Sequence, residues 1–121
     1  MPIGASDTRY LIFRPHTRAP EECSVKWLRK PALSRMRSLI EPLLGNNYME
    51  HISVLYLGHM RDMFVAEEGK LHGMRYNERA TEIYHNLLLK HHEGPYPTDP
   101  KATLGIIVGV AVLFPDRRVW F

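Results

Sequence analysis

The sequence predicts one α+β domain, residues 1–121, in which two helices pack on a mainly antiparallel sheet of five or six strands. Short runs of branched and aromatic residues end at proline or glycine, while two other segments place apolar residues at helical spacing. The composition, 45% hydrophobic and 24% charged in 121 residues, is that of an ordinary globular domain. The expected order of elements is β-β-α-β-β-α-β-β.

Two strands are expected first. Thr8–Arg14 is rich in aromatic and branched residues, and Pro15 ends it. After a polar turn, alternation predicts a second, half-buried strand. The two alternating sets are Cys23, Val25 and Trp27, and Ser24, Lys26 and Leu28.

A helix is expected next, with Pro31 as its first residue because proline lacks the amide hydrogen that is unsatisfied there. Gly45 supplies a C-terminal stop. Pro42 clashes with the preceding turn, so the helix is expected to kink or end near Ile40 or Glu41. The apolar residues at helical spacing are Leu33, Met36, Leu39, Ile40, Leu43 and Leu44.

A pair of strands follows. His51–Leu57 has partly apolar faces on both sides, which predicts a central strand rather than an edge strand. Gly58 opens a turn, Asp62–Ala66 returns as the next strand, and Gly69 suits a tight turn. Glu67 and Glu68 are interpreted as solvated turn residues, because adjacent side chains in an extended segment point to opposite sides.

The second helix begins after Asn77, a favoured N-cap residue. Its apolar stripe consists of Ala80, Ile83, Tyr84, Leu87 and Leu88. A loop rich in glycine and proline follows, and Gly105–Phe114 is then expected to be a buried strand. Arg117–Phe121 is expected to fold back as a last short strand at a sheet edge.

A terminal edge strand invites pairing with another chain. The sequence therefore predicts association through the C-terminal edge, either as a homodimer or with a host protein. The residues assigned to this interface are Phe114, Trp120 and Phe121, and packing in the core is the alternative.

Several spaced features of residues 50–114 resemble domain of unknown function family 3846, which occurs in bacteria, phages and plasmids. The residues that carry the resemblance are Glu50; Val65, Glu67 and Gly69; Gly73, Asn77, Ala80 and Thr81; and Ile107, Val108, Gly109, Ala111, Val112 and Leu113. The family has no agreed enzymatic activity. The resemblance thus implies an accessory protein of a mobile element.

A helix N-terminus is favourable for anions, so a ligand notch is one interpretation of Asn77, Thr81, Arg75 and Arg79. The alternative is a plain cap with a small residue for packing. The sequence predicts no catalytic residue, no metal site and no cofactor. One cysteine excludes an intrachain disulfide and a zinc site built from cysteines. His91 and His92 diverge on a helix rather than converge.

The charge of +3 is uneven, because residues 1–45 hold eight Lys or Arg and four acidic residues. A basic half can bind nucleic acid through phosphates, although no helix-turn-helix or zinc-finger motif is present. The candidate residues are Arg14, Arg18, Lys26, Arg29, Lys30, Arg35 and Arg37. A solvated surface is the alternative interpretation.

The longest apolar run, residues 104–114, is shorter than the roughly 20 residues that a membrane-spanning helix needs. No secretory signal is recognised, so we expect a cytoplasmic protein without membrane contact. The predicted function is a small non-enzymatic binding or accessory protein of a phage or mobile element, for example an inhibitor of a host defence component. Nucleic-acid binding, and a small-ligand site or cryptic enzyme around Asn77 and Thr81, are the alternatives.

Overall fold

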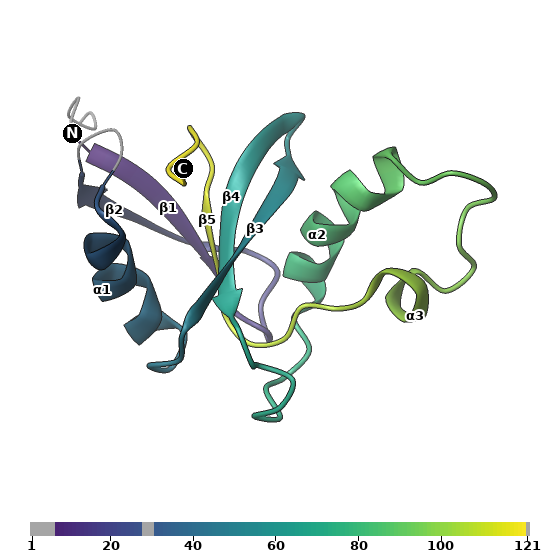
Figure 1. Cartoon of the computed structure of the whole chain (residues 1–121), viewed down its shortest axis with the longest axis horizontal. Coiled ribbons are helices and arrows are strands. Elements are labelled where there is room, and N and C mark those ends of the chain that lie inside the picture. Colours follow the sequence, from purple (N-terminus) through teal and green to yellow (C-terminus); the bar gives the residue numbers. More distant parts are fainter. Residues whose placement is uncertain (1–6, 28–30, 121) are drawn as a thin grey trace.

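The computed structural model describes residues 7–27 and 31–120. Five strands and three helices form in this part of the chain (Figure 1). In chain order they are β1 (Asp7–Phe13), β2 (Glu21–Lys26), α1 (Leu33–Leu43), β3 (Met49–Tyr56), β4 (His59–Ala66), α2 (Glu78–Lys90), α3 (Pro100–Leu104) and β5 (Ala111–Phe114).

All five strands belong to one sheet, in the order β2-β1-β5-β4-β3. Every neighbouring pair of strands is antiparallel. The predicted α+β class with helices on an antiparallel sheet is therefore confirmed. The last strand in the sequence, β5, lies at the centre and joins the β1–β2 hairpin to the β3–β4 hairpin. The two halves of the sheet meet only through this short strand.

The sheet separates two layers of apolar side chains, one under each long helix (Figure 1). Side chains of directly paired residues lie on the same face, so the register assigns each strand residue to a face. The core of the face that we call the α1 face includes Tyr10, Ile12, Phe64, Val112 and Phe114 with Met36 and Ile40 of α1. The core of the α2 face includes Leu11, Phe13, Met63, Val65 and Leu113 with Ala80 and Ile83 of α2.

The ends of α1 differ from the prediction. The helix begins at Leu33, two residues after Pro31, and continues through Pro42 to Leu43 instead of ending near Ile40. Proline in the last turn removes one hydrogen bond only, and the amide of Leu44 still reaches the carbonyl of Ile40 at 3.2 Å. Gly45 then adopts a left-handed φ of 73°, as the predicted stop requires.

The prediction that β3 is a central strand is wrong, because β3 forms one edge of the sheet. Its two apolar faces have another cause: α1 and α2 both contact β3, one on each side. The predicted strand Gly105–Phe114 is also too long. Only Ala111–Phe114 is a strand, and the unpredicted helix α3 ends at Leu104. Residues 105–110 are irregular because much of their backbone bonds to the start of α2.

Candidate functional site

A hollow of about 260 Å³ opens where the ends of β3 and β4 meet α2 and the irregular segment before β5. We call it the acidic groove. Its strand wall belongs to the α2 face, where Ile52 and Val65 present apolar side chains, and Tyr84 of α2 adds an aromatic ring. The other lining residues are Glu50, Ala66, Glu67, Glu68, Gly69, Lys70, Leu71, Gly105, Ile106, Ile107 and Val108.

The hairpin register brings two carboxylates together at the groove. Glu50 of β3 lies directly opposite Val65 of β4. Glu67 follows Val65 by two residues, and its amide donates to the carbonyl of Tyr48 at 2.9 Å, which extends the ladder beyond the strands. Glu50 and Glu67 are therefore diagonal neighbours on one side of the sheet. They flank Val65 at the mouth of the hollow.

The groove carries more negative than positive charge. Glu50 and Glu67 are exposed, and within the described residues neither side chain has an ion-pair partner. Glu68 approaches His72 at 4.0 Å. Among the residues that line the hollow, Lys70 is the one Lys or Arg. Three carboxylates around an apolar wall favour a cation with apolar atoms attached.

Two glycines fix the loop after β4 against residues 105–110. A Cβ atom at Gly69 would lie 3.0 Å from Cγ2 of Val108, and one at Gly109 would lie 2.7 Å from Sδ of Met74. Gly109 also has a φ of 75°, which side chains rarely adopt. The close approach holds the two loop walls of the groove together.

No family model matches this chain. The searches of curated proteins and of solved structures found no match either. The resemblance to family 3846 therefore stays a prediction. Its residues are nonetheless grouped in space, since six of them line the acidic groove: Glu50, Val65, Glu67, Gly69, Ile107 and Val108.

Asn77 and Thr81, predicted as a ligand notch, use their polar atoms inside the fold. The predicted cap is confirmed, because Oδ1 of Asn77 accepts from the amide of Ala80 at 3.1 Å. The Nδ2 atom of Asn77 donates to the carbonyls of Phe13 and Gly109 at 2.9 and 2.8 Å. Asn77 therefore has no amide hydrogen left for a ligand.

Thr81 completes this cluster. Its hydroxyl donates to the carbonyl of Asn77 at 2.7 Å and accepts from the amide of Ile107 at 2.9 Å. Neither Asn77 nor Thr81 lines the hollow, but together they position the wall at Ile107. Arg79 pairs with Glu82 at 3.3 Å, and Arg75 is exposed.

Three of the seven basic residues proposed for nucleic acid are paired with acids. Arg14 contacts Glu21, and Arg37 contacts Glu41. Arg18 bridges to Glu82 and Glu78 of α2, and its hydrogen bonds to Glu82 raise the pKa of Arg18 and lower that of Glu82. Lys26 and Arg35 are exposed, while Arg29 and Lys30 lie outside the described residues.

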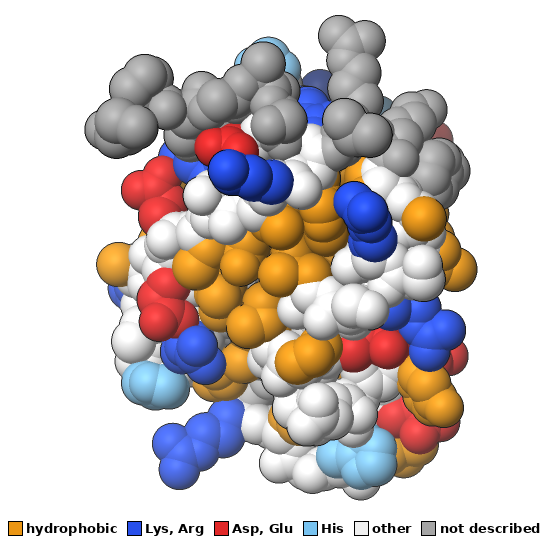
Figure 2. Space-filling view, turned by 90° about the vertical axis from the view of Figure 1, so that its left-hand side faces the viewer, with side chains coloured by type: hydrophobic (Ala, Val, Ile, Leu, Met, Phe, Trp, Pro, Cys, Tyr) orange, Lys and Arg blue, Asp and Glu red, His pale blue; other side chains and the backbone are white. Residues whose placement is uncertain are grey.

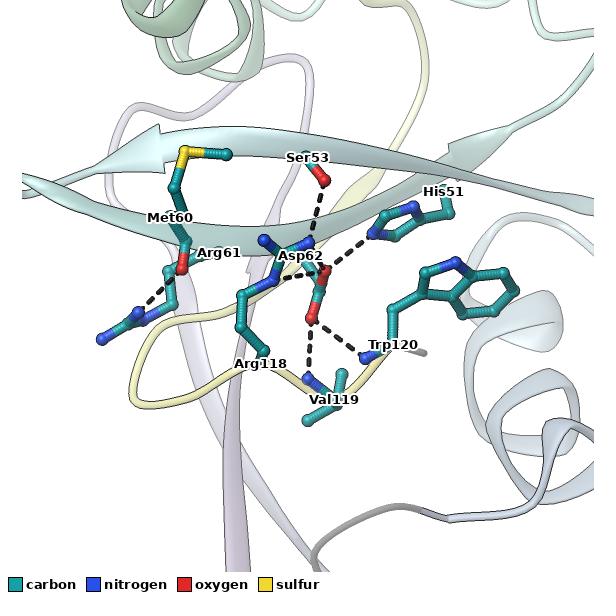
Figure 3. A network of polar contacts seen from close by, with 8 residues as sticks. All are labelled: His51, Ser53, Met60, Arg61, Asp62, Arg118, Val119 and Trp120. Carbon is teal, nitrogen blue, oxygen red and sulfur yellow. Dashed lines mark hydrogen bonds and ion pairs between the residues drawn. The ribbon is translucent and has the colours of Figure 1, made fainter.

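A buried carboxylate that the sequence did not reveal holds the end of the described chain. Asp62 of β4 has no exposed surface and lies on the α1 face (Figure 3). Its Oδ2 atom accepts from the amides of Val119 and Trp120 at 2.7 and 3.0 Å. Its Oδ1 atom lies 2.7 Å from Nε2 of His51 and 2.6 Å from Arg118.

The charge state of Asp62 follows from these contacts. Burial alone raises the pKa of a carboxyl group, but the bonds from Arg118, His51 and the two amides outweigh burial and lower the pKa of Asp62. Trp120 stacks on His51 with ring centroids 4.9 Å apart (Figure 3). The Asp62 cluster therefore works as an anchor for the segment that follows β5.

This anchor corrects the prediction of a last strand at Arg117–Phe121. Residues 115–120 form no strand, because the amides of Val119 and Trp120 bond to a side chain instead of a neighbouring strand. The sheet edges belong to β2 and β3. Of the assigned interface residues, Phe114 is fully buried, Trp120 is partly buried, and Phe121 lies outside the described residues.

Two further findings concern metal binding and membrane crossing in the described part of the chain. No group of three or more His, Cys, Asp or Glu side chains there is arranged to hold a metal ion. None of the described helices combines the length and the apolar character that crossing a membrane requires.

Proposed function

We propose that this chain is a small non-enzymatic binding protein and that the acidic groove takes a basic side chain of a partner protein. The observation that carries the proposal is the pair Glu50 and Glu67, two carboxylates beside an apolar wall that have no ion-pair partner among the described residues. Arg and Lys join an aliphatic stem to a cationic head. The stem can pack on Ile52 and Val65 while the head lies between the carboxylates.

The size of the groove favours an anchor side chain over a free small molecule. Pockets for drug-sized ligands are roughly 300 to 1,000 Å³, and this hollow is about 260 Å³. One long side chain with its adjoining backbone fills such a volume. The rest of the affinity then comes from the surface around the groove, as in other protein interfaces.

The polar clusters of the fold also support a binding role. The side chains of Asp62 and Asn77 use their hydrogen bonds on other groups of this chain, so their role is to hold segments in place. Together with the resemblance to family 3846, this favours an accessory protein of a phage or other mobile element. A host protein, such as a defence component, is then the expected partner.

A peptide titration followed by amide NMR tests the groove. The probes are acetyl-Gly-Arg-Leu-Gly-amide and the same peptide with Glu in place of Arg. We expect the Arg peptide to shift the amides of residues 65–71 and 105–108, and the Glu peptide to leave them unchanged. The affinity should fall as salt rises, because exposed charges are screened.

Matched variants make the titration decisive. Glu50→Gln combined with Glu67→Gln should weaken Arg-peptide binding about tenfold or more, from the loss of two charge-assisted contacts. Glu93→Gln removes an exposed carboxylate outside the groove and should leave binding unchanged. Equal binding by the double variant and the wild type would refute the proposal, and so would peptide-induced shifts spread over the whole surface.

A further inference from the structure

The β2 strand is an open edge of the sheet. Within residues 7–27 and 31–120 it is the first strand in the sheet order and pairs with β1 on one side only. Every residue of Glu21–Lys26 is exposed or partly exposed. The helices contact β3, which forms the opposite edge. An open edge presents unpaired amide and carbonyl groups that another strand can bond.

We propose that a second copy of this chain pairs with the β2 edge in an antiparallel arrangement, with a two-fold axis at Ser24. Such an axis stands perpendicular to the sheet and keeps each face continuous across the two copies. A residue of one copy must therefore lie opposite a residue of the other copy that is on the same face of the sheet. The proposal is independent of the acidic groove, which lies beside β3 and β4.

The sequence of β2 selects this register. With Ser24 opposite the partner's Ser24, Glu22 lies opposite the partner's Lys26, and symmetry repeats the pair. Opposite charges directly across two strands attract, while like charges repel. An axis at Cys23 instead places Glu22 opposite the partner's Ser24, so neither Glu22 nor Lys26 then meets an opposite charge on the second copy. Of these two registers, only the one with the axis at Ser24 places opposite charges across from one another.

Both charged side chains are available for the pairing. Lys26 is exposed. The side chain of Glu22 is 63% exposed and contacts Arg9. Arg9 also holds Asp116 at 2.8 Å, so it keeps an acidic partner if Glu22 turns toward a second copy. Arg9 therefore keeps Asp116 as an acidic partner when Glu22 pairs with the second copy in the dimer.

The apolar surface supports the same arrangement. Figure 2 shows the side on which α1 and β2 lie in Figure 1, with hydrophobic side chains gathered in its middle and charged ones around them. Cys23 and Val25 are opposite Tyr10 and Thr8, so they lie on the α1 face. In the Ser24 register Cys23 lies beside the partner's Val25. The partly exposed apolar surface then continues from one copy into the next.

A charge-swap experiment tests the proposal. Sedimentation equilibrium of the full chain should show a reversible dimer. Glu22→Lys and Lys26→Glu should each weaken the dimer about tenfold, because two attractive pairs become repulsive. An equimolar mixture of the two variants should recover near wild-type affinity, since the opposite charges face one another again. Glu93→Lys is the matched control and should not change the dimer.

A cysteine scan checks the register without altering charge. Cys23→Ser combined with Ser24→Cys should form a disulfide-linked dimer in oxidised glutathione, because residue 24 faces itself across the axis. The wild type, with Cys23 off the axis, should crosslink much more slowly. A wild-type chain that stays monomeric at high micromolar concentration overturns the proposal. A mixture of charge variants that fails to recover, or faster crosslinking through Cys23, does so as well.

Discussion

The Asp62 and Asn77 clusters both hold distant segments of the chain together, but they use different hydrogen-bonding groups. Each residue is fully buried, and each joins segments that are distant in the sequence. Asp62 accepts from the amides of Val119 and Trp120 on the α1 face. Asn77 donates to the carbonyls of Phe13 and Gly109 at the start of α2. Of the backbone groups, Asp62 satisfies donors only, whereas Asn77 satisfies two acceptors and also the amide of Ala80.

The difference lies in charge. Asn77 is neutral and meets backbone dipoles, so its bonds are the same at any moderate pH. Asp62 is ionised and relies on the guanidinium of Arg118 and on His51 as well as the two amides. Leaving a buried carboxylate without its partners is more destabilising than breaking a neutral bond. The segment after β5 is therefore fixed more strongly than its lack of secondary structure suggests, and only under conditions that keep Asp62 ionised.

Asp62→Asn should have the largest effect. The new amide group presents donors where Arg118 or the backbone amides also donate, so we expect a loss of about 3 kcal/mol in the free energy of unfolding. Urea unfolding at neutral pH measures it. Asp116→Asn is the control: its ion pair with Arg9 is on the surface, and its loss should cost about 1 kcal/mol or less. Equal losses of unfolding free energy for both variants would contradict the role of Asp62 as an anchor.

Asn77→Ala should follow, with a loss of about 2 to 3 kcal/mol. The substitution removes the N-cap and leaves the carbonyls of Phe13 and Gly109 without their donor. Asn86→Ala on the same helix is the control, because Asn86 is exposed and makes one bond of 3.2 Å to the carbonyl of Leu55. If both variants unfold at the same urea concentration, the Asn77 cluster does not hold the fold together.

The elements that the sequence predicted well are those with local signals. β1 and α2 follow from β-branched runs and a helical stripe, and the cap at Asn77 depends on residues three positions apart. The segment Gly105–Val110 looked like a strand because it is rich in Ile and Val. Its backbone instead bonds to Asn77, Thr81 and Arg75. Such tertiary partners override local propensity.

The Asp62 cluster and the pair of groove carboxylates escaped prediction because they depend on residues that are distant in the sequence. Asp62 and Arg118 are 56 residues apart, and an aspartate at the start of an apolar strand is indistinguishable from a turn residue. Glu67 lies in the turn after β4 and is exposed, as predicted. Its position beside Glu50 depends on the β3–β4 register, which places both residues next to Val65 on the same face of the sheet. The register of a hairpin must be known before paired carboxylates can be recognised.

The pH dependence separates the two clusters directly. The folded pKa of Asp62 is lowered, so its stabilisation is complete above the unfolded pKa of about 4 and is lost as the pH falls through the folded pKa. The wild type should therefore lose stability below about pH 4 more steeply than Asp62→Asn does. Asn77→Ala should keep the wild-type slope. Urea midpoints measured from neutral to acid pH give all three curves, and parallel curves would assign the acid sensitivity to other carboxylates.

Thr81→Val should have the smallest effect on the free energy of unfolding, and it tests a single residue of the Asn77 cluster. Valine has nearly the same shape as threonine but no hydroxyl, so the buried amide of Ile107 loses its acceptor while the packing is kept. We expect a loss of about 1 to 2 kcal/mol. Thr98→Val, in an exposed loop, should have almost no effect. Because Ile107 belongs to the wall of the acidic groove, Thr81→Val should also loosen that wall and speed hydrogen exchange at residues 105–108. Unchanged exchange there, despite a measured loss of stability, would show that the groove keeps its shape without the Thr81 bond.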